Sequence, residues 1–221
     1  IPLCLVGSEM CIRDRDNADI ERCADMLMLS GRPNPLILIL LSLPNWLLPQ
    51  QIRNFKETLR SKEFSKAFVE IMESEGSDFR TSDYPNSDPW RKAEIPAANG
   101  HGTAAGIAKF FGILANDGQR DGKKLLSPEI IEQATTVRTS GPDLVLFQAP
   151  YKFGLGYMID APFSPIGMKE GMFGHTGIAG SAGFADLNNK VGFGFTNNRQ
   201  HSLGKLYRTS NNLAKKLYEI L

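Results

Sequence analysis

The chain has 221 residues, of which 42% are hydrophobic and 22% charged, a composition typical of a folded globular protein. Its 25 lysines and arginines almost balance 24 aspartates and glutamates, and the resulting net charge of +1 argues against nucleic acid or an anionic membrane surface as a partner. The strongest apolar run, residues 36–43, is far shorter than the roughly 20 residues of a membrane-spanning helix, so no membrane span is predicted.

Residues 1–15 lack the basic start and the apolar stretch of a signal peptide. Their letters resemble the translated read-through of a sequencing adapter more than any protein motif. We therefore expect residues 1–15 to be a non-native lead-in and the domain proper to begin at residue 16. The compartment stays open, with a slight preference for the cytoplasm because no signal peptide is visible.

Helical patterns are predicted in the middle of the chain. Apolar residues recur at every third or fourth position over residues 51–75, which predicts an amphipathic helix. Thr103 fits the N-cap of a second helix, which Gly118 would end. A third helix is predicted to begin at Ser127-Pro128-Glu129, since this triplet supplies a cap, a proline at the first helical position and an acid in the first turn.

The last third of the chain has the period of strands. Residues 152–159 are predicted as one strand, and residues 181–187 with 191–197 as a hairpin that turns at Asn188-Asn189. In the last strand Gly192 and Gly194 share one face, which predicts that another element packs closely against it. From about residue 203 a helix is predicted to lie on the sheet through an apolar stripe made of Leu206, Leu213, Leu217 and Ile220.

Three short motifs are weaker candidates for chemistry. Residues 100–105 fit the dinucleotide fingerprint G-x-G-x-x-A, but no strand precedes them, so a tight loop before a capped helix is the better interpretation. Ser202 and Lys205 form an S-x-x-K pair, a match that arises easily by chance, and Tyr84-Pro85-Asn86 has the letters Y-x-N within a loop rich in serine, aspartate and proline. No metal and no organic cofactor is predicted, because zinc-site spacing is absent from the three histidines, His101, His175 and His201.

Three separated blocks carry the strongest signal, residues 93–104, 173–184 and 192–199. In this order they resemble the C-terminal half of the β-lactamase-related serine hydrolases, which include class C β-lactamases, D-alanyl peptidases and β-lactamase-like carboxylesterases. The resemblance covers residues 86–201 well. It implies an α+β fold of the β-lactamase-like (penicillin-binding transpeptidase-like) type, in which an antiparallel sheet is flanked by helices and the N-terminal part of the domain is missing.

The resemblance also implies a site. The family's third motif, K-T-G or a variant such as H-T-G, matches His175-Thr176-Gly177. By resemblance, the backbone N–H of Ile178 is one of two oxyanion donors, a kind of group typically worth about 10²–10³ in rate. Thr176 would contact the substrate, and Gly177 would let the substrate approach the strand backbone.

His175 stands where the K-T-G motif has lysine, and this difference affects which substrates the site would favour. Unperturbed histidine titrates near pH 6.5, so His175 would be largely neutral above pH 7, whereas lysine is cationic throughout this range. A neutral side chain holds a substrate carboxylate less firmly. Among small-molecule ester, amide or lactam substrates, the sequence therefore favours neutral esters and amides over β-lactams.

In the family, S-x-x-K and Y-x-N precede these blocks, whereas here Ser202–Lys205 follows them and Tyr84–Asn86 stands close to the first block. We therefore expect the nucleophilic serine and its lysine and tyrosine bases to be absent from this chain. Residues 16–221 would be the C-terminal portion of a single β-lactamase-related domain, inactive by itself, from a serine hydrolase that acts through an acyl-serine. The alternative is a non-catalytic relative that keeps the fold for binding or assembly.

Overall fold

The computed structural model describes residues 20–27, 39, 42–61, 84–93, 100–143, 149–160, 170–177, 180–199 and 207–221. In chain order the described elements begin with the 3-10 turn η1 (Asn45–Leu47), helix α3 (Gln50–Arg60), the 3-10 turn η2 (Tyr84–Asn86) and helix α5 (Asp88–Lys92). The helix predicted over residues 51–75 is confirmed as far as α3 reaches, and residues 62–75 lie outside the described part.

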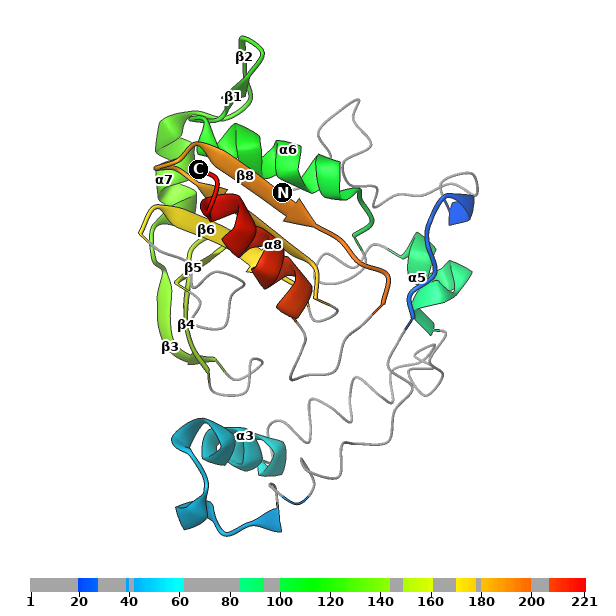
Figure 1. The fold of residues 1–221 in the computed structure, drawn as a ribbon, viewed down its shortest axis with the longest axis vertical. Helices are drawn as coiled ribbons and strands as arrows, with labels where there is room; N and C mark the ends of the chain where they lie inside the picture. Colours follow the sequence, from blue (N-terminus) through cyan, green and yellow to red (C-terminus); the bar gives the residue numbers. More distant parts are fainter. Residues whose placement is uncertain are drawn as a thin grey trace.

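Both helix starts predicted from capping residues are confirmed. Helix α6 (Ala104–Ala115) begins after Thr103, whose hydroxyl accepts the N–H of Gly106 at 3.0 Å. Helix α7 (Pro128–Thr135) begins after Ser127, whose hydroxyl accepts the N–H of Ile130 at 3.4 Å. Each cap satisfies one of the N–H groups that the first helical turn leaves without a partner. Between the helices a short antiparallel hairpin, β1 (Gln119–Arg120) and β2 (Lys123–Lys124), extends from the body (Figure 1).

The rest of the described chain is built around one six-stranded sheet. Every neighbouring pair of strands is antiparallel, and the strands follow one another in chain order. Their bounds are β3 (Thr139–Asp143), β4 (Ala149–Phe153), β5 (Met158–Asp160), β6 (Met172–Thr176), β7 (Ala182–Asp186) and β8 (Val191–Phe195). An antiparallel sheet in chain order needs only short connections between its strands.

The single strand predicted over residues 152–159 is wrong, because a turn divides it into β4 and β5. Gly156 adopts a φ of +83°, a conformation that glycine reaches without strain. The N–H of Leu155 donates to the carbonyl of Ala134 at 2.8 Å, and a Cβ on Gly154 would lie 2.2 Å from that same oxygen. The glycines thus let the turn lie tightly on α7, and the chain reverses where an uninterrupted strand was expected.

The predicted hairpin of β7 and β8 is confirmed. Lys190 has the positive φ, 58°, whereas neither Asn188 nor Asn189 is in that region. The two asparagines instead donate their backbone N–H groups to the Asp186 carboxylate, at 2.9 and 3.1 Å. The turn is therefore held by a side-chain acceptor at the end of β7.

Close packing on the glycine face of β8 is confirmed, and the packed element is α6. A Cβ on Gly192 would lie 2.0 Å from the Gly112 nitrogen and 2.5 Å from the Ala108 carbonyl oxygen. A Cβ on Gly194 would lie 2.4 Å from the Ala104 carbonyl oxygen. Small residues on both elements therefore bring the backbones of α6 and β8 together.

Helices cover both faces of the sheet (Figure 1). On one face, α6 and α7 contribute to an apolar cluster of Phe111, Leu114, Ala115, Ile131, Phe173 and Ala185. On the other face, the terminal helix α8 (Arg208–Tyr218) joins a second cluster of Met158, Met172, Phe184 and Ala214. Neighbouring strand residues such as Phe184 and Ala185 belong to different clusters, as the alternation of a strand requires. None of the described helices is long and apolar enough to cross a membrane.

The apolar stripe predicted to bury α8 is confirmed only in part, since Leu217 is half-buried. Leu213 is 49% exposed and Ile220 is 77% exposed, whereas Ser210 and Ala214 are fully buried; Leu206 lies outside the described residues. The helix is turned so that its small residues approach the sheet. At its end, the hydroxyl of Tyr218 donates to Asp186 at 2.6 Å. Small side chains, one hydrogen bond and the half-buried Leu217 therefore define the buried face of α8.

Candidate active site

His175 and Thr176 are the last two residues of β6, and Gly177 follows directly. They face β7 in a regular register, with His175 opposite Gly183 and Thr176 opposite Ala182. The pairing continues past the strand, since the N–H of Gly177 donates to the carbonyl of Ser181 at 2.8 Å. The structure thus brings the predicted triplet together at one end of a central strand.

Within the described residues, the other edge of β6 has no pairing strand at this end. The N–H of Gly177 is directed toward β7. Because neighbouring residues of a strand direct their backbone groups to opposite edges, the N–H and C=O of Thr176 are directed away from β7. There β5 meets β6 at Met158 and Gly174, and no strand in the described part continues the pairing as far as Thr176. The N–H of Thr176 is therefore directed at this edge as a donor for a bound molecule.

The side chain of His175 is exposed and leans on this edge. Its Nδ1 lies 2.8 Å from the carbonyl oxygen of Thr176. Because a carbonyl only accepts, Nδ1 carries the proton in this contact, and Nε2 of the neutral ring is left as an acceptor. The ring of Phe153 lies beside it, 6.3 Å between centroids. The imidazole can thus accept a hydrogen bond from a neutral group at the site.

Thr176 and Gly177 are set by close contacts. The Thr176 hydroxyl lies 3.9 Å from the sulfur of Met158, and a Cβ on Gly177 would lie 2.3 Å from the Ser181 hydroxyl oxygen. The N–H of Gly180 donates to the carbonyl of Gly177 at 2.9 Å, which closes a turn. Ile178 lies within this turn by sequence but outside the described residues, so its role as an oxyanion donor stays a prediction.

The remaining sequence motifs have different outcomes in the described part of the chain. In the glycine-rich segment at residues 100–105, the Thr103 hydroxyl caps α6, as expected for a loop that feeds a helix. Ser202, Lys205 and His201 lie outside the described residues. Among the residues that the structure does describe, no group of three histidine, cysteine, aspartate or glutamate side chains could hold a metal ion.

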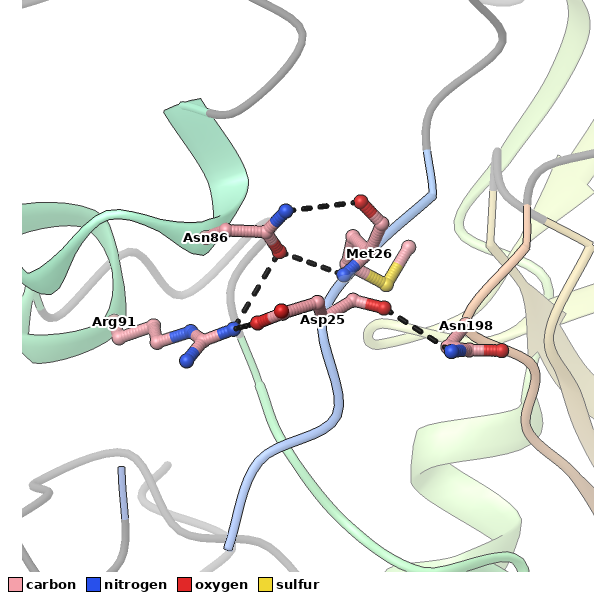
Figure 2. Close-up of polar contacts among 5 residues, drawn as sticks. All are labelled: Asp25, Met26, Asn86, Arg91 and Asn198. Carbon is pink, nitrogen blue, oxygen red and sulfur yellow. Dashed lines mark hydrogen bonds and ion pairs between the residues drawn. The ribbon is translucent and has the colours of Figure 1, made fainter. Parts of the chain in front are cut away.

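Asn86, from the Y-x-N letters, has a structural role. Its amide oxygen accepts the backbone N–H of Met26 at 2.6 Å, and its amide nitrogen donates to the Met26 carbonyl at 3.0 Å (Figure 2). Arg91 also donates to the amide oxygen of Asn86 at 3.4 Å. The side chain thus pairs with the main chain of a distant segment.

The same contacts join three distant segments of the chain, and sequence reasoning missed them. Arg91 is 7% exposed and donates to the Asp25 carboxylate at 2.6 Å, while Asn198 donates to the Asp25 carbonyl at 3.1 Å (Figure 2). The N–H of Leu27 donates to the Asn198 carbonyl at 2.6 Å. No local pattern in the sequence names the partners of Arg91, because they lie in distant segments of the chain.

Comparison with known families agrees with this geometry. The family model described as Beta-lactamase matches residues 60–215, most of the chain. The chain belongs to the β-lactamase family. The family resemblance inferred from the sequence is thereby confirmed. The matched range includes β3 to β8 and the triplet at the end of β6.

The chain is also similar to individual known proteins. The curated "Esterase/beta-lactamase LipL" of Mycobacterium tuberculosis is 41% identical over 112 residues, which is 50% of this chain and 25% of that protein. A penicillin-binding protein homologue from Caulobacter crescentus has a TM-score of 0.57 at 28% identity, covering 86% of this chain and 43% of its own. A family VIII carboxylesterase has a TM-score of 0.51 at 30% identity, covering 60% and 37%.

The fold likeness extends to a more distant protein. EstA from Arthrobacter nitroguajacolicus Rue61a has a TM-score of 0.61 at 19% identity, covering 94% of this chain and 49% of its own. The expected α+β, β-lactamase-like fold with an antiparallel sheet flanked by helices is therefore confirmed. The chain spans a quarter of the curated relative and less than half of each solved structure.

Proposed function

We propose that this chain contributes the strand that lines the substrate site of a serine hydrolase. The reaction would be acyl transfer to water through an acyl-serine, on small ester or amide substrates rather than β-lactams. The observation that carries the proposal is the open edge of β6, where the Thr176 backbone faces no described strand. Relatives described as an esterase/β-lactamase and as a carboxylesterase support the same chemistry.

Each residue of the triplet has a proposed task at this edge. Thr176 contacts the substrate, and Gly177 keeps the strand free of a side chain where the substrate passes. The N–H of Ile178 donates to the oxyanion that forms when the serine attacks, a group whose charge exists in the transition state and not in the substrate. His175 orients a neutral portion of the substrate through Nε2.

The substrate preference is tested on the full-length protein encoded by the complete reading frame. At pH 7.5 we expect p-nitrophenyl butyrate to be hydrolysed with a higher kcat/KM than benzylpenicillin, because no fixed cation at position 175 holds the penicillin carboxylate. A purified chain of residues 16–221 is expected to hydrolyse neither. Faster turnover of penicillin than of the ester would contradict the proposed substrate preference.

Replacing His175 by lysine should shift this preference. A lysine adds a permanent cation at an exposed position, where an ion pair is worth up to about 1 kcal/mol, so kcat/KM for benzylpenicillin should rise about two- to fivefold. The value for p-nitrophenyl butyrate should not rise. Asn212→Lys on the exposed side of α8 adds the same charge elsewhere and serves as the control. An equal gain in both variants would mean that the charge acts from anywhere on the surface.

A further inference from the structure

The hydroxyl of Ser210 is buried at the contact between α8 and the end of the sheet. The residue is 0% exposed, and its Oγ lies 3.4 Å from the carbonyl oxygen of Gly180 and 3.2 Å from that of Tyr207, one turn back in the helix. A buried hydroxyl needs an acceptor, and these two carbonyls share it. The contact links α8 to residues thirty positions earlier in the chain.

Gly180 closes the turn that follows the H-T-G triplet. Its N–H donates to the Gly177 carbonyl at 2.9 Å, and its φ of +104° favours glycine. Gly180 is buried, so its carbonyl also needs a donor. Gly177 and Gly180, the two ends of the turn, are thus hydrogen-bonded to each other, and Ser210 connects Gly180 to α8.

We propose that Ser210 is a positioning residue for the site at the end of β6, holding the Gly177–Gly180 turn through the carbonyl of Gly180. The inference rests on the proposed function, because the turn matters for catalysis only if its backbone receives the substrate. An oxyanion donor acts only when its N–H is aimed at the developing charge, and small displacements weaken it. Ser210 acts on that geometry without touching the substrate.

The sequence of α8 agrees with this task. At a buried helix position alanine has the better helix propensity, and a serine there competes for backbone groups of its own helix. Ala214, one turn further on the same face, shows that alanine fits against the sheet. The hydroxyl of Ser210 therefore adds a directed contact to the turn that packing alone would not supply.

The test compares Ser210→Ala with Thr209→Ala, an exposed neighbour on the same helix. Amide hydrogen exchange of the purified chain is followed residue by residue in NMR spectra. In Ser210→Ala the amides of Gly177 and Gly180 should exchange about fivefold faster, the effect of losing one hydrogen bond, while those of Phe184 and Ala185 in β7 keep their rates. Thr209→Ala should change none of them.

In the complete protein, Ser210→Ala should lower kcat for p-nitrophenyl butyrate about fivefold and leave KM unchanged, since the turn acts in the transition state. Unchanged exchange at Gly177 and Gly180, or an equal increase at all four amides, would overturn the inference. If the unmodified protein hydrolyses no ester, the proposed function fails, and the exchange rates alone then decide whether Ser210 holds the turn.

Discussion

Replacing Gly192 by alanine is expected to lower the free energy of unfolding by about 3 kcal/mol or more, the upper end of what overpacking costs. The added Cβ would lie 2.0 Å from the Gly112 nitrogen and 2.4 Å from its Cα. Both atoms belong to the helix backbone, which cannot rotate away as a side chain can. The strand and α6 would have to separate, and the cluster around Phe111 would lose contacts.

Gly112→Ala is the matched control, because it makes the same change on the other side of the same contact. A Cβ at Gly112 would meet nothing within 4 Å. Alanine in a helix interior is about 0.5–1 kcal/mol more favourable than glycine, so this variant should be slightly more stable. Urea unfolding followed by circular dichroism measures both. A loss of similar size in the two variants would show that the contact does not depend on backbone proximity.

Features that are set by neighbouring residues could be predicted from the sequence. Thr103 and Ser127 cap their helices through N–H groups three residues away, so the signal and its effect lie in one short stretch. The alternation of Gly192 and Gly194 with bulky residues likewise predicts a close contact. Its partner, α6, could not be named from the strand alone, because the three small residues that meet the glycines are ordinary in any helix.

Features that depend on the arrangement of distant elements could not be predicted. The apolar periodicity of α8 favours leucines on the sheet, yet Leu213 is exposed because the helix is oriented by Tyr218 and Ser210, which bond to Asp186 and to Gly180. A helical period shows which residues share a face and leaves open which face is buried.

The same distinction applies to the site. The letters of His175-Thr176-Gly177 identify the triplet through resemblance, and the strand that carries it was part of no periodic pattern. The open edge exists because β5 begins only at Met158. The turn before β5 is held by the hydrogen bond from Leu155 to Ala134 on α7, and this contact sets where β5 begins. Site geometry of this kind arises from tertiary contacts, which no short window of sequence contains.

One buried carboxylate joins the β7–β8 hairpin to the end of α8. Asp186 is 2% exposed and accepts the backbone N–H groups of Asn188 and Asn189, the Asn189 amide at 2.7 Å and the Tyr218 hydroxyl at 2.6 Å. Burial alone would raise the pKa of Asp186, but the hydrogen bonds from Asn189, Tyr218 and the turn outweigh it and lower the pKa below its usual value. Burial, together with the bond to Asp186 and the charge of that carboxylate, raises the pKa of Tyr218 well above its ordinary range.

Asp186→Asn should therefore lower the free energy of unfolding by about 2–4 kcal/mol at pH 7, because donors that now bond to a charged acceptor would face an amide that satisfies fewer of them. The folded protein holds the ionised form more tightly than the unfolded chain does. The carboxylate's contribution is thus complete above the ordinary carboxyl pKa of about 3.9 and is lost as the pH falls through the lower folded value.

Urea unfolding at several pH values between 3 and 7 tests this expectation, since the gap between the original protein and Asp186→Asn should be widest at pH 7 and narrow below pH 4. Tyr218→Phe is the comparison variant, because it removes only one of the donors that lower the pKa of Asp186, so it should cost about 1 kcal/mol at pH 7 and its gap should narrow less than that of Asp186→Asn as the pH falls. A gap for Asp186→Asn that is constant from pH 7 to pH 3 would mean that the charge of Asp186 stabilises nothing. The hairpin and α8 would then be held together by packing around Phe184 and Ala214, and the orientation of α8 would need another cause.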